Sequence, residues 1–338
     1  YEMARGLAEQ VENTLEKAVG EQIPTVEQIQ DTVEKVLIES GHARTAKKYI
    51  LYRNERTRVR EMNTRLMKVY EDLTFQSSLE NDVKRENANI DGDTAMGTML
   101  KYGSEGAKQF YEMFILDPAH ANAHREGDIH IHDLDFLTLT TTCCQIDLLK
   151  LFDGGFSTGH GFLREPNDIR SYAALACIAI QSNQNDQHGG QSIVNFDYGM
   201  APGVVKTFIR LYRQNLARAL MLLAGQEDPE GEVKAIIAAV KEQTGLFPRL
   251  EDWRAYCDAE RPLLLETFGG TEEEMKKAQE FAHYRAVKET DRATYQAMEA
   301  LIHNLNTMHS RAGAQTPFSS INYGMDTSPE GRMVMKNV

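Results

Sequence analysis

Residues 128–144 read DIHIHDLDFLTLTTTCC, and this stretch decides the fold that the sequence predicts. Its first part, from Asp128 to Asp133, alternates polar and apolar residues with a period of two. Its second part, from Phe136 to Cys144, is rich in threonine and apolar residues. Both patterns are typical of short β-strands, so we expect two neighbouring strands here.

Outward from this stretch, helical and strand patterns alternate. Residues 192–196 and 315–324 have the composition of further strands. Helical spacing is predicted between and before the strands, at residues 95–115, 146–152, 168–181, 203–224 and in a long helix from residue 271. Because helices separate the strands, we expect parallel pairing and an α/β fold.

The first 58 residues differ from the rest, because they are highly charged and their pattern is helical throughout. Thr25 and Gln28 form a capping box at the start of one helix, and Gly41 closes that helix. We therefore predict two domains, residues 1–58 and residues 59–338.

Composition excludes several classes of protein. The 338 residues carry a net charge of −13, which argues against a nucleic-acid-binding surface. No apolar run approaches the roughly 20 residues that a membrane-spanning helix needs, so we expect no membrane contact. The four cysteines lack zinc-ligand spacing, and their use fits a reducing cytoplasm.

His130 and His132 are two residues apart and would face the same way on a strand. Such a pair can chelate a metal, as in metal-dependent hydrolases, or it can be hydrogen-bonded in a polar interior. The hydrolase alternative needs further ligands at later strand ends, whereas His160 and His188 lie in glycine-rich stretches.

Cys143 and Cys144 point to opposite faces of a strand, so at most one of them can face an active site. The alternative for either is a small buried side chain of the core.

Two predicted loops, residues 154–161 and 183–190, combine glycine with Asn, Gln, Ser and His. Such loops can surround a phosphate or a base with donors, or they can be plain connections.

Taken together, these motifs resemble the class III anaerobic ribonucleotide reductases over nearly the whole chain. They occur in the family's order: Asn87-Ala88-Asn89, residues 127–135, Cys143 to Asp147, His188-Gly189-Gly190, Asn306 to His309 and Gln315 to Phe318. Residues 1–58 resemble the C-terminal part of the ATP-cone regulatory module, whose N-terminal strands are not recognised here.

The resemblance implies a ten-stranded α/β barrel, of which this chain holds the N-terminal half behind an ATP-cone remnant. The implied activity is the reduction of ribonucleoside triphosphates to deoxyribonucleoside triphosphates. Cys143 matches the barrel cysteine that takes part in ribose reduction, and we expect it to face the interior beside His130 or His132. These three residues are the predicted catalytic set. Thr142 departs from the asparagine that the family often has there.

The resemblance also implies binding residues. The expected substrate-facing residues are Asn87, Asn89, Thr316, Pro317, Phe318 and Ser319. The expected effector-binding residues are Ser157, Thr158, Gly159, His160, Gln184, Asn185, Gln187, His188, Gly189 and Gly190. ATP and deoxyribonucleoside triphosphates are the implied effectors.

Partners and cofactors follow from the same resemblance. A glycyl radical, installed by a radical-SAM iron–sulfur activating enzyme, and a zinc site are expected beyond Val338. A homodimer is expected to form through helix 168–181, whose small-residue face carries Ala173, Ala174, Ala176 and Ala179. The alternative for the chain by itself is a nucleotide-binding, dimerising regulatory module.

Overall fold

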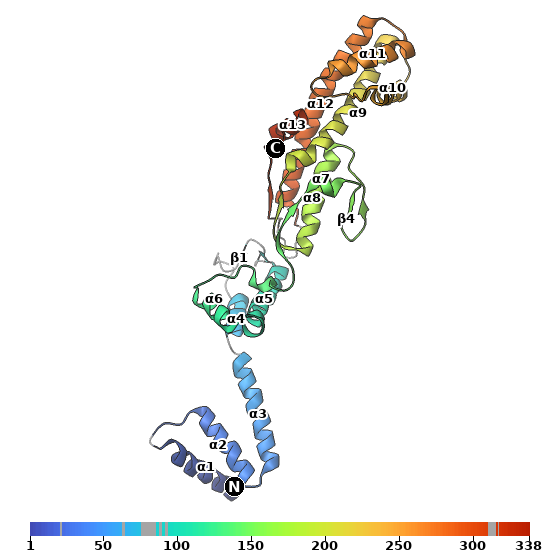
Figure 1. The fold of residues 1–338 in the computed structure, drawn as a ribbon. Coiled ribbons are helices and arrows are strands. Elements are labelled where there is room, and N and C mark those ends of the chain that lie inside the picture. The colour runs from blue at the N-terminus through green and yellow to red at the C-terminus, as the bar shows by residue number, and fades with distance from the viewer. Residues whose placement is uncertain are drawn as a thin grey trace. The chain divides into compact units, whose positions relative to one another are not determined.

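The structure is a computed structural model that describes residues 1–20, 22–62, 65–75, 86–87, 90–91, 94–309, 316 and 318–338. Its internal contacts divide the chain into two compact units, Tyr1–Ser77 and Ser78–Val338 (Figure 1). Helix α3 runs through residue 58, and the domain boundary expected there stays a prediction.

The first unit contains α1 (Glu2–Val19), α2 (Val26–Glu39), α3 (Ala43–Met62) and α4 (Arg65–Phe75). The capping box at the start of α2 is confirmed, since Gln28 N–H donates to Thr25 Oγ1 and Thr25 N–H donates to Gln28 Oε1. Helix α3 is joined to α2 by Arg53, which binds three carboxylates on one face of α2: Glu27, Asp31 and Glu34.

In the second unit, a short sheet lies against a layer of helices. The sheet has the order β3 (Thr142–Ile146), β6 (His188–Ile193) and β7 (Ser319–Ile321), and both pairings are parallel. The expectation of parallel strands separated by helices is thus confirmed. These strands are the parallel sheet of the described residues, and the ten-stranded barrel stays a prediction.

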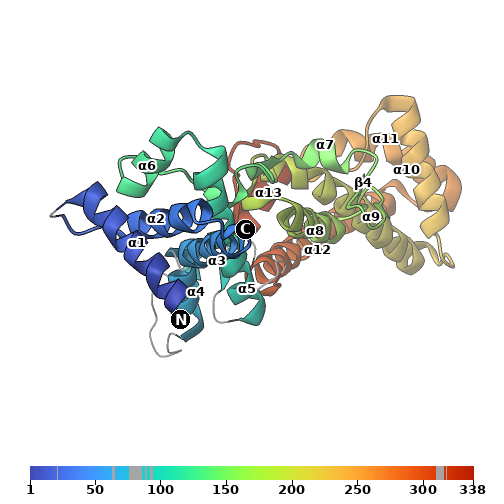
Figure 2. The ribbon, with the colours of Figure 1, turned by 90° about the horizontal axis from the view of Figure 1, so that it is seen from below.

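The helices between the strands build the core. Between β3 and β6 come α7 (Leu148–Phe152), a hairpin of β4 (Phe156–Ser157) and β5 (Phe162–Leu163), and α8 (Ile169–Asp186). Between β6 and β7 come α9 (Phe196–Ala224), α10 (Glu230–Thr244), α11 (Arg254–Phe268) and α12 (Glu272–Thr307). Figures 1 and 2 show α9 and α12 side by side, and α13 (Pro329–Asn337) packs on both.

Close approach of α9 to its neighbours depends on two glycines. A Cβ at Gly199 would lie 2.6 Å from Leu148 Cβ, and one at Gly203 would lie 2.8 Å from the Tyr172 ring. Leu148 and Tyr172 are both buried, so neither can move aside cheaply.

The strand expected at residues 128–133 is wrong. Helix α6 (Pro118–Glu126) ends at Gly127, and the chain then turns into the 3-10 helix η2 (Leu134–Phe136). His124 Nδ1 accepts the Ile131 N–H at 3.2 Å, so a side chain takes the donor that a partner strand would need. Alternation of polar and apolar residues was therefore a misleading signal here.

The loop expected at residues 183–190 is also wrong. Helix α8 continues to Asp186, and strand β6 begins at His188. The amide of Asn185 donates to the Gln181 carbonyl, and Gln187 N–H donates to the Asn183 carbonyl, so polar residues extend the helix. The loop expected at residues 154–161 is built around the β4–β5 hairpin.

The helical region from residue 95 is as expected, with α5 (Ala95–Phe110) followed by the π-helix η1 (Tyr111–Ile115). Strands β1 (Glu86–Asn87) and β2 (Ile90–Asp91) pair antiparallel before it. Within the part of the chain that the structure describes, no helix is both long and apolar enough to cross a bilayer.

Candidate functional site

Cys143 lies at an irregularity of strand β3. Its backbone is left-handed, with φ of 63°, and the pairing with β6 shifts between Thr142 and Cys144. Cys143 is exposed, whereas Cys144 is half-buried and packs against the hydrophobic core. The two neighbouring thiols therefore have different surroundings, and only that of Cys143 is accessible.

The start of strand β6 surrounds Cys143. Gln187 Nε2 donates to the Cys143 carbonyl at 3.2 Å and to Thr141 Oγ1 at 2.6 Å. Gly189 has φ of 93°, and a Cβ there would lie 2.8 Å from Cys143 N and 3.1 Å from Cys143 Sγ. Only glycine fits this position without displacing the cysteine.

His130 and His132 lie in the turn before η2, with ring centroids 6.1 Å apart, and His130 is exposed. The side chain of His132 keeps 76% of its surface exposed. Among the described residues, no group of three or more His, Cys, Asp or Glu side chains is arranged to hold a metal ion. The catalytic role of these two histidines stays a prediction.

A cavity of 390 Å³ lies between the β4–β5 hairpin, strand β3 and helix α8. The expected effector residues Ser157, Thr158 and Gly159 line it, together with Cys144 and residues of α8 that include Ser182, Asn183 and Asp186. His160 is not among its lining residues.

A second cavity, of 500 Å³, holds four other expected effector residues, which are Gln184, Asn185, Gln187 and His188. Helix α5 supplies the opposite wall through Met99, Leu100, Gly103, Ser104 and Ala107. This wall could not be predicted from the local pattern, since α5 is more than 70 residues away from Gln184 in the chain. Asp186 lines both cavities, so the last turn of α8 lies between them.

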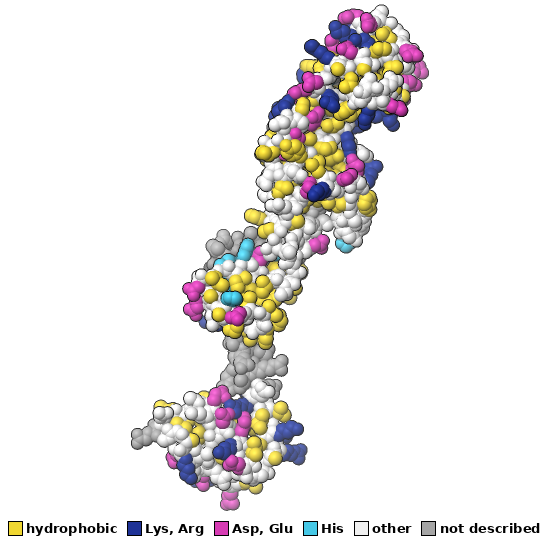
Figure 3. Space-filling view, viewed as in Figure 1, with side chains coloured by type: hydrophobic (Ala, Val, Ile, Leu, Met, Phe, Trp, Pro, Cys, Tyr) yellow, Lys and Arg dark blue, Asp and Glu magenta, His cyan; other side chains and the backbone are white. Residues whose placement is uncertain are grey.

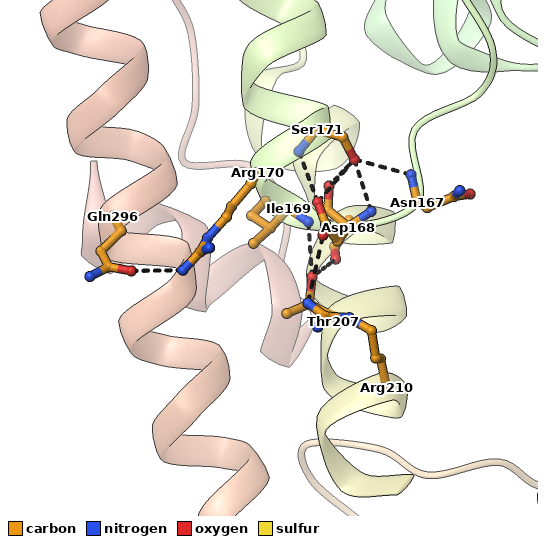
Figure 4. Close-up of polar contacts among 9 residues, drawn as sticks. Asn167, Asp168, Ile169, Arg170, Ser171, Thr207, Arg210 and Gln296 are labelled. Atoms are coloured by element: carbon orange, nitrogen blue, oxygen red, sulfur yellow. Dashed lines mark hydrogen bonds and ion pairs between the residues drawn. The ribbon is translucent and has the colours of Figure 1, made fainter. Parts of the chain in front are cut away.

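A pocket of 400 Å³ at the start of α8 was also missed by sequence reasoning (Figure 4). Three arginines from three helices line it: Arg170 of α8, Arg210 of α9 and Arg292 of α12. Arg170 donates to the neutral amide of Gln296 at 3.0 Å, so that contact leaves its charge uncompensated.

Asp168 opens helix α8 beside the arginines. Burial opposes ionisation of this carboxyl, but hydrogen bonds from Ser171 and the nearby Arg210 outweigh burial and lower its pKa. Arg210 Nη2 lies 3.6 Å from Asp168 Oδ2. The Ile169 N–H, at the first position of α8, has no partner within the helix, and the buried Thr207 Oγ1 accepts it at 2.8 Å (Figure 4).

The expected substrate-facing residues are placed only in part. Asn89 and Pro317 lie outside the described residues, and of Asn87 only the backbone is described, in β1. Thr316 and Phe318 are exposed, and Ser319 begins β7 opposite Gln191. The Phe318 ring is near Gly190, where a Cβ would lie 3.2 Å from it.

The alanine face of α8 does not have the place expected for it. Ala173, Ala176 and Ala179 are buried in the core of the second unit, whereas Ala174 is exposed. These three alanines therefore pack inside one subunit and cannot form a dimer interface.

The second unit is thus a helix-rich α/β unit with a small parallel sheet and an exposed cysteine, and comparison with known sequences gives its family. The family model described as anaerobic ribonucleoside-triphosphate reductase matches residues 86–338, and that described as ATP cone domain matches residues 1–58. The chain belongs to the anaerobic ribonucleoside-triphosphate reductase family.

Curated relatives carry the same name. The chain is 25% identical to the anaerobic ribonucleoside-triphosphate reductase of Escherichia coli K12 over 315 residues, which cover 93% of this chain and 36% of the relative. It is 25% identical to that of Haemophilus influenzae over 319 residues, with the same coverage, and 24% identical to that of enterobacteria phage T4 over 266 residues, covering 76% and 33%. The chain spans about a third of the length of these relatives.

Proposed function

We propose that this chain supplies the reducing cysteine and the nucleotide-binding surfaces of an enzyme that converts ribonucleoside triphosphates to deoxyribonucleoside triphosphates. The observation that carries the proposal is the placement of Cys143. It is exposed on strand β3, and Gln187, which borders the 500 Å³ cavity, donates a hydrogen bond to its carbonyl. The family membership of residues 86–338 supports the same conclusion.

In this proposal, the 2′-hydroxyl leaves as water and Cys143 donates one hydrogen atom to the ribose, which leaves the sulfur one electron short. A two-electron reductant from outside the chain, either formate or a dithiol protein, restores the thiol and supplies the second electron. A glycyl radical, installed by a radical-SAM activating enzyme, supplies the radical that starts the reaction. The residues of this chain hold the substrate without adding a fixed charge at the ribose, since Thr, Gln, Asn and Ser side chains bind hydroxyls by hydrogen bonds. Zinc belongs, in this proposal, to another part of the enzyme.

The test uses the full-length reductase with its activating enzyme. Cys143→Ala is expected to abolish nucleotide reduction while leaving effector binding intact. Cys177→Ala is the control for loss of a thiol, because Cys177 is buried in helix α8. Normal turnover by Cys143→Ala would remove this cysteine from the mechanism.

We infer that nucleotide effectors act on the last turn of α8. Asp186 borders both cavities, so a ligand against the hairpin can change the position of residues that line the second cavity. On the face drawn in Figure 3, acidic and basic side chains are interspersed, which fits small anionic ligands better than a long polyanion.

Hydrogen exchange tests this control. Adding a deoxyribonucleoside triphosphate should slow exchange in residues 154–163 and 183–190 together. Ser157→Ala, in the lining of the first cavity, should weaken that effect, whereas Ser40→Ala, at an exposed serine of the first unit, should not. If the nucleotide protects neither segment, the effector assignment fails.

We also propose a homodimer through the outer face of α8, where Ala174 and Ile178 are exposed. Ala174→Glu should then shift the oligomeric state toward monomer in light scattering, with no change in secondary structure. The matched control is Ala255→Glu, at an exposed alanine of α11. A monomer in the unmodified protein, with and without nucleotide, would contradict the proposal. Residues 1–58 match the ATP cone domain, but its N-terminal strands are not recognised here, so we expect them to bind ATP or dATP weakly or not at all. Calorimetry tests this, and micromolar ATP binding that is lost on deleting residues 1–58 would contradict it.

A further inference from the structure

A carboxylate and an imidazole that the proposed reaction does not use lie beside the cysteine. Asp133 Oδ1 is 3.3 Å from His188 Nε2, and the two side chains keep only 9% and 8% of their surface exposed. The His188 ring is also stacked on Phe136, with centroids 3.8 Å apart and an interplanar angle of 14°. The carboxylate contacts the edge of the imidazole and Phe136 covers one face of the ring, so the two contacts together fix its orientation.

Both contacts come from one turn. Asp133 has a left-handed backbone, with φ of 50°, and its carbonyl accepts the Phe136 N–H at 2.9 Å. Aspartate and asparagine tolerate this conformation better than other residues with a side chain. The turn presents the carboxylate and the phenyl ring to His188 together, which accounts for an otherwise costly backbone at this point.

His188 is the central residue of the segment that surrounds Cys143. The residue before it, Gln187, donates to the Cys143 carbonyl, and the residue after it, Gly189, abuts Cys143 N and Sγ. His188 itself pairs with Thr142 in the sheet. Any movement of the His188 ring is therefore transmitted through one peptide bond on either side to the backbone that borders the cysteine.

We propose that Asp133 and His188 are positioning residues for Cys143: the carboxylate fixes the ring, and the ring fixes Gln187 and Gly189 against the cysteine. The functional part of this inference rests on the proposed function, in which Cys143 reduces the ribose. With His188 neutral, the contact requires the tautomer that carries its proton on Nε2.

A second imidazole lies near the same carboxylate. His132 Nδ1 lies 3.5 Å from the same Asp133 oxygen, but the His132 side chain is 76% exposed. Water competes for an exposed contact of this kind, so it contributes little to the position of the carboxylate. His132→Gln is therefore the matched control for loss of an imidazole next to Asp133.

Hydrogen exchange on the full chain tests the placement without any turnover. Asp133→Ala should speed exchange of residues 187–190 by about fivefold, the effect of losing one hydrogen bond of ordinary strength. Exchange in α12 should not change, and His132→Gln should leave both regions as they are. Asp133→Asn should restore slow exchange, because an amide oxygen still accepts the Nε2 proton. An unchanged rate at residues 187–190, or an equal rise in α12, would overturn the proposal.

The functional consequence is tested in the full-length reductase. Asp133→Ala should lower kcat for nucleotide reduction with little change in KM, and Asp133→Asn should recover most of kcat. A rise in KM alone would show that the pair serves substrate binding and not the cysteine. If Cys143 proves unnecessary for reduction, the proposed function fails, while the exchange result still decides whether the pair positions this backbone.

Discussion

Replacing Asp197 with asparagine is expected to destabilise the second unit strongly. Asp197 is 1% exposed in the first turn of α9, and its Oδ2 accepts three backbone N–H groups, from Gly324 at 2.8 Å, Met325 at 2.8 Å and Asp326 at 2.9 Å. These bonds fix the chain just after strand β7. The carboxylate therefore joins two segments that are 127 residues apart.

The magnitude follows from the change in those bonds. A hydrogen bond to a charged group contributes about 1.5–3 kcal/mol and a neutral one about 0.5–1.5 kcal/mol, so Asp197→Asn loses about 1 kcal/mol per bond and about 3 kcal/mol over three bonds. Asp197→Ala leaves three buried donors without an acceptor and should cost more. Asp153→Asn, at an exposed carboxylate, is the control and should change stability little.

The effect should depend on pH. Burial opposes ionisation of Asp197, but hydrogen bonds from the backbone of Asp326, Gly324, Met325 and Tyr198 lower its pKa below the ordinary value. A lowered folded pKa gives stability that is complete above the unfolded pKa, about 3.9, and is lost as the pH falls through the folded pKa. The difference between wild type and Asp197→Asn should thus be constant near neutral pH and shrink below about pH 4.

Urea unfolding followed by tryptophan fluorescence measures this difference, because Trp253 is the one tryptophan of the sequence and lies in the same unit. Two results would refute the reasoning. One is a midpoint for Asp197→Asn that matches the Asp153→Asn control. The other is a difference from wild type that grows as the pH falls.

Three further predictions follow. Arg53→Lys should lower the melting temperature of the first unit, measured by circular dichroism, because one ammonium cannot bind three carboxylates as a guanidinium does. This loss of melting temperature should shrink in high salt, and an equal loss at all salt concentrations would contradict the prediction. Burial raises the pKa of Glu260, so the folded state keeps a proton that the unfolded chain releases, and the free energy of unfolding should fall as the pH rises above about 4.3. Urea titrations at several pH values should show that Glu260→Gln lacks this pH dependence of stability. An unchanged pH dependence would point to another group. Gly189→Ala should lower the free energy of unfolding by about 1–3 kcal/mol and displace Cys143, and the rate of thiol alkylation reports that displacement. Gly190→Ala should have a milder effect, because the nearest atoms to a Cβ there belong to the edge of the Phe318 ring.

Several elements could be predicted because their signals are local. The capping boxes at Thr25 and Thr271 both start the helices they mark. Asp168 begins α8 as an N-cap. Each of these depends on residues within one turn or one strand.

The failures have a common cause in contacts made from outside the local pattern. Residues 128–133 alternate like a strand, but the imidazole of His124 binds the Ile131 N–H, and no strand of the described residues pairs with them. The polar stretch after Gln181 has the composition of a loop, yet it completes α8. The alanine face of α8 has the pattern of an interface, but the interior of the same subunit covers it.

The sequence by itself determined the family and the alternation of strands and helices, since motif order and side-chain periodicity are properties of the chain alone. The choice of Cys143 over Cys144 stays a prediction. Only the tertiary structure decided which groups meet. Arg170, Arg210 and Arg292 are far apart in sequence and line one pocket, and Asp133 reaches His188 across 55 positions. Such pairings depend on how helices pack and how strands register, and these follow from the summed contacts of the whole fold and not from any short stretch.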